Sequence, residues 1–277
     1  MLHRRIAEEQ PPVRDGGFVY PSIAGDVVEF RDDNRKVFAA YHFRDPFKSF
    51  FRGLLTPNGC DVVCPPPQDH PHHKGLQYGL CADDVNFWEE QDPDHPSRRI
   101  GRQVTETLKL RPPGHGAGFV QDLVWRDAVC VSFKETRTIS VERLTQPAYS
   151  WTWRTTITAE RDLRLIKSAW SEGPGQRGYC GLGLRLAPDL FNKSSLVPPL
   201  PSDMPETPKT VTFHGRGVNV TFAQDTTRQQ DAVFVSPSEL NQLDFTFMSL
   251  GPTNIAPRRL KTGERLEREY TVTVADA

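Results

Sequence analysis

Several features are scarce or missing in this 277-residue chain, and each absence removes a class of protein. No apolar run approaches the roughly twenty residues that a membrane-spanning helix needs, so we expect no contact with a membrane. Lysine and arginine number 34 against 35 acidic residues, and no basic block is interleaved with aromatic residues. A nucleic-acid partner is therefore not expected either. No segment shows a long amphipathic helical pattern, which disfavours a helical fold.

Cysteine is also sparse. The five cysteines are odd in number and irregularly spaced, and Cys60 and Cys64 lack the second close pair of a zinc ribbon. The segment Met1–Glu9 has two arginines but no apolar stretch after them, so we expect no secretory signal. These observations predict reduced thiols in a cytoplasmic protein.

The sequence motifs of common cofactor and nucleophile sites are missing as well. We find no phosphate-binding loop and no pattern typical of a Ser-His-Asp nucleophile. The segment Gly181–Gly183 lacks the third glycine and the following helix of a dinucleotide fingerprint. We therefore expect a protein that uses no cofactor.

Short β-rich runs, separated by Gly, Pro, Asn and Asp clusters, fill the chain from Val28 onward. A dozen such runs at this spacing predict an all-β fold, a large antiparallel β-sandwich. No composition shift marks a boundary, so we expect one domain over residues 1–277, with an N-terminal extension at 1–25 and a proline-rich loop at 192–209. The expected strands are Lys36–Phe43, Gln103–Leu110, Gly118–Trp125, Ala128–Val141, Tyr149–Thr158, Leu163–Trp170, Tyr179–Leu186, Thr210–Phe213, Val218–Phe222, Ala232–Val235, Leu243–Leu250 and Glu267–Val274.

The most informative segment is Asp69–Lys74, which follows a proline run and holds three of the eight histidines, a carboxylate and an ammonium. Proline fixes φ and lacks an N–H donor, so this segment cannot be an ordinary helix or central strand. Imidazoles are the usual proton shuttles near neutral pH and the commonest metal ligands. A loop that presents a site is therefore favoured over a surface loop that is rich in His and Pro by chance.

Two of the expected strands carry unusual faces. The period of two in Ala128–Val141 places Glu135 and Arg137 in the middle of an otherwise apolar face. Burying two unpaired charges costs several kcal/mol, so these residues should pair with each other or line a polar cavity. In Tyr179–Leu186, two glycines stand between Tyr179 and Arg185 on one face, which indicates either a ligand groove or close packing of another segment.

Aromatic residues offer two alternatives of the same kind. Tyr149, Trp151 and Trp153 share one face of a strand, where they are either core or a flat platform for a sugar ring, and core is the commoner use. Trp88 and its carboxylate neighbours follow the histidine segment and could close one side of the same cavity.

Six segments of the chain carry a resemblance to a known family: Ser49–Gly59, Asp69–Leu76, Val85–Trp88, Glu135–Thr138, Gly178–Leu182 and Leu260–Asp276. Together they resemble the PmoA-like family, and the resemblance covers most of Phe50–Asp276. It implies a galactose-mutarotase-type sandwich and a sugar-like ligand. The chain departs from the family pattern at Arg52 and Gln121, where the family commonly has histidine, and this difference suggests a recruited function such as a tailoring step on a natural product.

Together these observations predict a small-molecule enzyme of isomerase or lyase type. His70, His73 and Glu135 are the expected proton-transfer groups, because positioned His and Glu side chains suffice for general acid–base catalysis. Two alternatives stay open: a binding protein without turnover, and a metal enzyme that uses His70 and His72. The sequence leaves the substrate, the reaction and the oligomeric state undetermined. The expected ligand-binding residues are Arg52, His72, Lys74, Trp88, Arg137, Tyr179 and Arg185.

Overall fold

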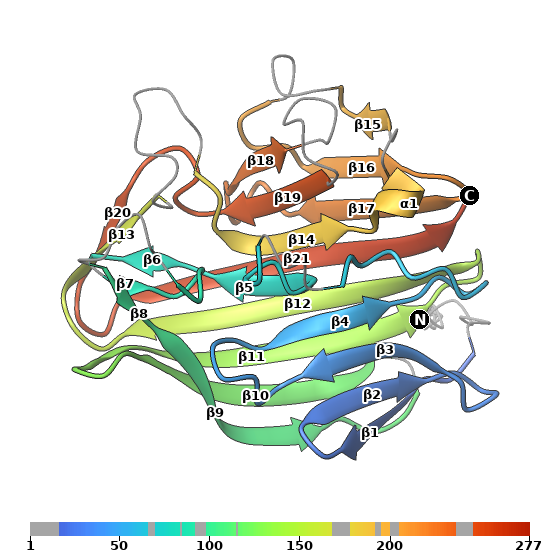
Figure 1. Cartoon of the computed structure of the whole chain (residues 1–277), viewed down its shortest axis with the longest axis horizontal. Helices are drawn as coiled ribbons and strands as arrows, with labels where there is room; N and C mark the ends of the chain where they lie inside the picture. The colour runs from blue at the N-terminus through green and yellow to red at the C-terminus, as the bar shows by residue number, and fades with distance from the viewer. Residues whose placement is uncertain are drawn as a thin grey trace, which may run out of the picture.

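The chain forms two large antiparallel sheets and one small sheet in a computed structural model (Figure 1). The structure describes residues 17–65, 70–83, 85–91, 98–114, 116–167, 178–191, 195–199, 205–236 and 246–277. Every strand pair of the two eight-stranded sheets is antiparallel, so the predicted all-β antiparallel fold is confirmed.

The first sheet has the strand order β1-β2-β3-β4-β5-β14-β19-β18. Its strands come from both ends of the chain, so the sheet is complete only when it includes the strand that begins at residue 246. The strands are β1 Tyr20–Ala24, β2 Val27–Arg31, β3 Val37–His42, β4 Phe50–Leu54, β5 Leu76–Gly79, β14 Gly181–Leu186, β18 Ala232–Ser236 and β19 Thr246–Gly251.

The second sheet has the order β15-β16-β17-β21-β12-β11-β10-β9 and contains the longest strands. Its strands are β9 Arg102–Leu110, β10 Ala117–Arg126, β11 Val131–Arg143, β12 Ala148–Ala159, β15 Ser195–Val197, β16 Thr210–His214, β17 Val218–Gln224 and β21 Arg265–Asp276.

A small third sheet has the order β20-β13-β6-β7-β8, with a parallel pair between β7 and β8. Within the described ranges the single helix is α1, Pro188–Phe191, and none there is long and apolar enough to cross a membrane. The strands of the third sheet are β6 Cys81–Ala82, β7 Val85–Asn86, β8 Arg99–Ile100, β13 Leu163–Ile166 and β20 Arg258–Leu260.

Two expected segments contain more structure than the sequence suggested. Strand β1 begins at Tyr20, so the first sheet starts inside the segment 1–25 that was expected to be an extension. Strand β15 lies within the expected loop at 192–209. Residues 1–16 of the extension, and residues 192–194 and 200–204 of the loop, lie outside the described residues.

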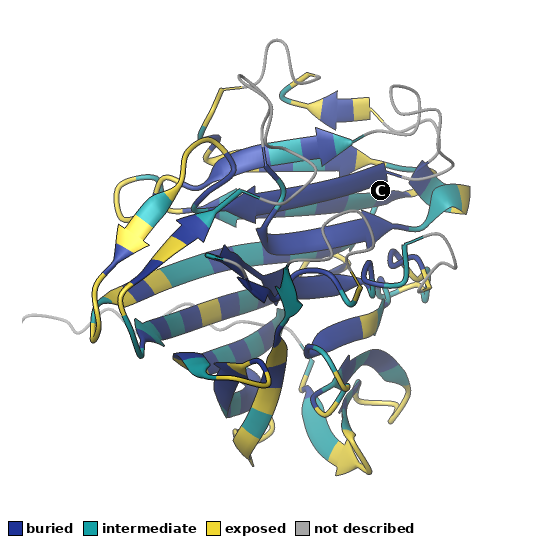
Figure 2. Cartoon of the chain, turned by 60° about the vertical axis from the view of Figure 1, so that its left-hand side comes forward, coloured by how far each residue is buried: buried dark blue, intermediate teal, exposed yellow. Residues whose placement is uncertain are grey.

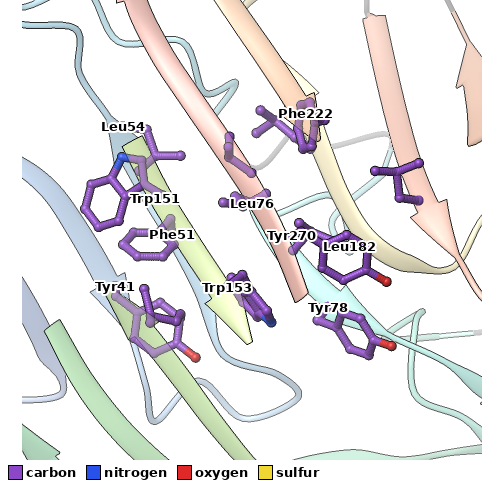
Figure 3. Close-up of a cluster of buried hydrophobic side chains, with 14 of the residues drawn as sticks. Tyr41, Phe51, Leu54, Leu76, Tyr78, Trp151, Trp153, Leu182, Phe222 and Tyr270 are labelled. Atoms are coloured by element: carbon purple, nitrogen blue, oxygen red, sulfur yellow. The ribbon is translucent and has the colours of Figure 1, made fainter. Parts of the chain in front are cut away.

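Aromatic side chains join the two large sheets. Phe30 on β2 meets Trp151 on β12 edge to face, with ring centroids 5.0 Å apart. Tyr78 on β5 stacks with Trp153, also on β12, at 6.5 Å. Figure 3 shows Tyr78, Trp151 and Trp153 within this cluster of buried side chains. Trp151 and Trp153 are therefore core, as the commoner interpretation of the aromatic face predicts.

Burial along the strands shows which faces are covered. The long strands of the second sheet alternate between buried and more exposed residues, as expected when one face packs on a core and the other faces solvent (Figure 2). In contrast, β5, β14 and β19 are buried at every position. Another part of the chain must therefore cover the face of the first sheet that points away from the second sheet, which we call the outer face.

The interior also holds a charged pair between the two large sheets. Arg137 Nε donates to Glu135 Oε1 at 2.8 Å, and Arg137 Nη1 donates to the hydroxyl of Tyr41 at 2.8 Å. Trp125 Nε1 and Thr155 Oγ1 donate to the two Glu135 oxygens at 2.7 and 2.6 Å. Both charged side chains are completely buried, so the expectation that they would pair with each other is confirmed.

We predict that Arg137→Met destabilises the fold by about 3–5 kcal/mol, because it leaves the Glu135 carboxylate buried without its counter-charge. Urea denaturation followed by circular dichroism measures this. The matched control is Arg154→Met, which removes a more exposed pair with Glu269 and should cost less than about 1 kcal/mol. Equal losses in the two variants would show that the buried pair contributes no more than a surface pair.

Candidate functional site

The histidine segment ends in a tight turn whose chemistry is visible in the sequence. The backbone N–H of His73 donates to the carbonyl of His70 at 2.9 Å, which closes a four-residue turn with Pro71 at its second position. Proline favours that position because its φ is already set to about −65°. Gly75 then has φ of 107° and lies against the carbonyl of Phe51, so the chain enters β5 through a conformation that glycine tolerates best.

This turn brings the three imidazoles together. The ring centroid of His73 lies 5.0 Å from that of His70 and 4.4 Å from that of His72. On its other side His73 stacks on Phe247, with centroids 4.6 Å apart and planes within 5°. Three histidines from one segment therefore form a single cluster, and His73 of this cluster stacks on Phe247 of β19.

The environment of His73 favours the neutral imidazole. Burial lowers the pKa of His73 well below its usual 6.5, and the charges of His72, His70, Arg185 and Lys48 lower it further. A neutral imidazole at physiological pH has a ring nitrogen that can accept a proton. His73 is thus suited to act as a base.

Trp88 covers the centre of the outer face. A methyl group at Gly183 would lie 2.6 Å from Trp88 Cη2, and one at Gly79 would lie 2.9 Å from Trp88 Cε3. Gly181 has φ of 81°, which is also a backbone reason for glycine. The absence of a side chain at Gly183 therefore lets Trp88 pack on β14. The alternative expectation of an open ligand groove above Gly183 is wrong.

The carboxylate neighbour of Trp88 is held by a local turn. Asn86 Oδ1 accepts the backbone N–H groups of Trp88 and Glu89, each at 2.9 Å. Glu89 is buried, and the hydroxyl of Tyr179 donates to its Oε1 at 3.4 Å. Tyr179 also meets Trp88 edge to face, with centroids 6.1 Å apart. The structure thus places Tyr179 and a carboxylate beside Trp88.

Two lysines connect this layer to the loop before β4. Lys74 Nζ lies 2.7 Å from Asp45 Oδ2 and 2.6 Å from Glu90 Oε1. Lys48 Nζ donates to the carbonyl of Trp88 at 2.7 Å and lies 3.4 Å from Glu90. Burial lowers the pKa of Lys48 to about 8, against the opposing effect of Glu90. Lys74 therefore holds the layer in place through ion pairs.

Arg185 and Gln77 complete the outer face beneath the turn. Arg185 is the cross-strand neighbour of Phe247 and is 5% exposed. Gln77 is the cross-strand neighbour of Gly183, and its Oε1 accepts the backbone N–H of Lys74 at 3.2 Å. Both side chains thus come from positions whose sequence neighbours point into the core.

Not every expected site residue belongs to this cluster. Glu135 and Arg137 contact the core aromatics Tyr41 and Trp125, whereas His73 lies on Phe247 on the opposite side of the first sheet. A cavity shared by Glu135, Arg137 and the histidines is therefore not formed, and that expectation is wrong. The period of two correctly placed the pair on the buried face, but that face belongs to the sandwich interior.

Arg52 is exposed on β4. The pKa of His42 is lowered chiefly by burial and next by the charge of Arg52. Gln121, the second position where the chain departs from the PmoA-like pattern, is buried inside the sandwich, where it accepts a hydrogen bond from Tyr41 at 2.7 Å.

Three residues of the cluster were missed by sequence reasoning: Lys48, Gln77 and Phe247. Gln77 had a weak signal, because it is a polar residue between Leu76 and Tyr78, whereas Lys48 stands between Phe47 and Ser49 and had none. Phe247 had none, because a phenylalanine in a strand is usually core. Asp69 of the histidine segment lies outside the described residues.

A metal centre was the third alternative. Across the part of the chain that the structure describes, no group of three or more His, Cys, Asp or Glu side chains has an arrangement that could hold a metal ion. The five cysteines are free thiols.

We predict that Gly183→Ala destabilises the protein by about 1–3 kcal/mol, because its methyl group would displace Trp88 and Phe247. Thermal unfolding measures the loss. Gly53→Ala is the control, since a methyl group there would only touch Asp61 at 3.4 Å and Leu55 at 3.8 Å. A Gly183→Ala protein as stable as the control would mean that Trp88 does not pack on β14.

We also predict that His73 makes stability depend on pH. Its pKa is lower in the folded protein than in the unfolded chain, so acid favours the unfolded state, which binds the proton more readily. Stability should fall as pH drops below 6.5, by up to about 1.4 kcal/mol per pH unit. Urea denaturation at several pH values should show a flatter dependence for His73→Gln than for His214→Gln. An imidazole of His73 that titrates in NMR at 6.5 or above would contradict this.

Comparison with known proteins adds a family but no activity. No curated protein shows significant similarity to the chain. Among solved structures, an α-galactosidase from Lactobacillus brevis is 9% identical over 94% of this chain and 39% of its own, with a TM-score of 0.43. A GH36 α-galactosidase, AgaA, from Geobacillus stearothermophilus in complex with 1-deoxygalactonojirimycin is 10% identical over 93% and 40%, with a TM-score of 0.36. The chain thus spans about two fifths of the length of either protein. The PmoA-like identification stays a resemblance of motifs, whereas the profile of one family matches residues 28–277, and the chain belongs to that family, DUF6807, a family of unknown function.

Proposed function

We propose that the chain is a cofactor-independent enzyme that transfers protons on an oxygen-rich, sugar-like small molecule at the outer face of the first sheet. His73 is the base. Glu89 takes the role of the carboxylate that the sequence analysis assigned to Glu135. Isomerisation, epimerisation and elimination can each be catalysed by a base and an acid positioned at a bound molecule.

The observation that carries this proposal is the buried His73 imidazole, whose ring centroid lies 5.0 Å from that of His70 and 4.4 Å from that of His72 and whose pKa is lowered by burial. Two buried histidines beside a third, partly buried one serve no packing purpose that apolar residues would not serve better. Perturbed pKa values of this kind cluster at functional sites. Glu135, in comparison, has both oxygens occupied by donors inside the sandwich.

The residue types on the outer face favour a ring-shaped, polyoxygenated ligand. Trp88, Phe247 and Tyr179 form an apolar cluster on the outer face that is separate from the main core. Aromatic surfaces suit the C–H faces of sugar rings, while Arg185 and Lys48 beside them provide donors for hydroxyl or carboxylate oxygens. A cytoplasmic location belongs to the proposal as well, and it rests on the free cysteines.

The test is exchange of carbon-bound protons with solvent. The full-length protein is incubated in D₂O with a panel of aldoses and sugar acids, and NMR follows deuterium incorporation and the interconversion of anomers. We expect His73→Gln and Glu89→Gln to lose about 10²–10⁴-fold in rate while the fold stays intact. His214→Gln, on the solvent-exposed end of β16, should keep full activity.

Other outcomes separate the alternatives. Activity retained in His73→Gln would overturn the proposal. Binding of panel members without any exchange would favour a binding protein. Loss of activity on chelation, with recovery on metal addition, would favour the alternative of a metal enzyme with His70 and His72 as ligands.

A further inference from the structure

Gln77 is a buried carboxamide in the middle of the outer face of the first sheet. Its cross-strand neighbours are Phe50 on β4 and Gly183 on β14, so the three positions form one row across the sheet. The exposed fraction of Gln77 is 0%. A primary amide has an acceptor oxygen and an N–H donor group, and in a buried position each needs a hydrogen-bond partner. The partners of the two ends therefore indicate the role of this residue.

The oxygen of the carboxamide is occupied by the histidine turn. The backbone N–H of Lys74 donates to Gln77 Oε1 at 3.2 Å. Because a backbone N–H must face an acceptor, this bond also determines which end of the amide is the oxygen and which is the nitrogen. Lys74 is itself held by ion pairs with Asp45 and Glu90, at 2.7 and 2.6 Å. The carboxamide is therefore anchored at its oxygen and keeps one orientation.

The nitrogen of the carboxamide differs from its oxygen. Gln77 Nε2 is buried and has no hydrogen-bond acceptor among the residues that the structure describes. Trp88 Nε1 is a second donor with this property, and its indole lies on Gly183, the cross-strand neighbour of Gln77. A buried donor without an acceptor is costly, so an acceptor oxygen of a ligand is favoured here. A role limited to the Lys74 N–H would explain the oxygen of Gln77 but not its nitrogen.

The carboxamide lies beside the proposed base. Lys74, whose N–H it accepts, directly follows His73 in the chain. The ring of Phe247, on which His73 stacks, also reaches the strand next to Gln77, because a methyl group at Gly183 would lie 3.0 Å from Phe247 Cζ. A ligand oxygen that Gln77 holds therefore belongs to the part of the ligand that faces the base.

We infer that Gln77 is a specificity-determining residue of this site, whose Nε2 donates a hydrogen bond to one hydroxyl oxygen of a sugar-like ligand. This inference rests on the proposed function and names the group by which the ligand is selected. The bond joins two neutral groups, so it selects by the position of a hydroxyl group. A site that donates to a hydroxyl group rejects the analogue that lacks it, because the buried donor then stays unsatisfied.

The experiment compares sugars that differ by a single oxygen. D-Glucose and D-galactose, each with its monodeoxy analogues, are titrated into the full-length protein by calorimetry. For a parent sugar that binds, we expect one analogue to bind about 5-fold to 150-fold more weakly. Gln77→Met keeps an unbranched side chain but removes the donor, so the parent and that analogue should then bind about equally. Gln146→Met, at an exposed position, is the matched control and should preserve the difference.

The difference between parent and analogue separates recognition from structure. A glutamine that only supports the turn would, when replaced, weaken both sugars alike and leave their ratio unchanged, which would overturn the inference. Equal affinity of the wild-type protein for a parent sugar and all its analogues would overturn it as well. So would the absence of binding of every one of these sugars at millimolar concentration.

A second measurement covers the case in which Gln77→Met fails to fold. In isotope-labelled wild-type protein, NMR follows the side-chain amide signals of Gln77. These signals should shift when the parent sugar is added at saturation and stay in place with the analogue that lacks the recognised hydroxyl group. Amide signals that respond to both sugars alike, or to neither, would contradict the hydrogen bond from Nε2.

The two proposals fail in different ways. Discrimination among deoxy sugars that Gln77→Met abolishes, without any proton exchange, would support the specificity residue and overturn the enzyme. Proton exchange that is equally fast on the parent sugars and all their analogues would overturn the specificity residue and leave the enzyme standing.

Discussion

The packing of Trp88 on two glycines is the contact on which the outer layer depends. Because Gly79 and Gly183 carry no side chain, the indole lies directly on the backbone of β5 and β14. This contact buries the centre of the first sheet on both faces, which is unusual for an antiparallel sheet with a solvated side. A second, smaller apolar cluster thereby forms outside the sandwich, and His73 rests on its Phe247.

The first sheet thus separates two kinds of buried ionisable group. Inside the sandwich, Glu135 and Arg137 satisfy each other, with further donors from Trp125 and Thr155. Such a saturated pair has no capacity left for a ligand and serves to fix the register of facing sheets. On the outer face, burial and the neighbouring charges lower the pKa of His73. A lowered pKa leaves an imidazole able to accept a proton at neutral pH, so the base that we propose lies on the outer face.

Long strands were predictable from the sequence, while short ones were not. β11 and β12 show the period of two over a dozen residues, because one face meets the core and the other meets solvent. β5 has only four residues, all buried, and therefore shows no alternation. The composition of the histidine turn marked it as a candidate site, and the structure brings its three imidazoles together. The error at Glu135 arose because periodicity tells which face is buried but not which sheet covers it, and that depends on contacts between distant segments.

The layer over β5 and β14 also explains why the motif Asp69–Leu76 ends as it does. Lys74 must turn back to reach Asp45 and Glu90, and the following Gly75, at φ of 107°, allows the chain to reverse into β5 against the carbonyl of Phe51. The ion pairs fix the end of the turn, and the bond from His73 to His70 fixes its start. With both ends fixed, the turn holds the imidazoles in their mutual geometry. Pro71 and Gly75 therefore serve to position the imidazoles.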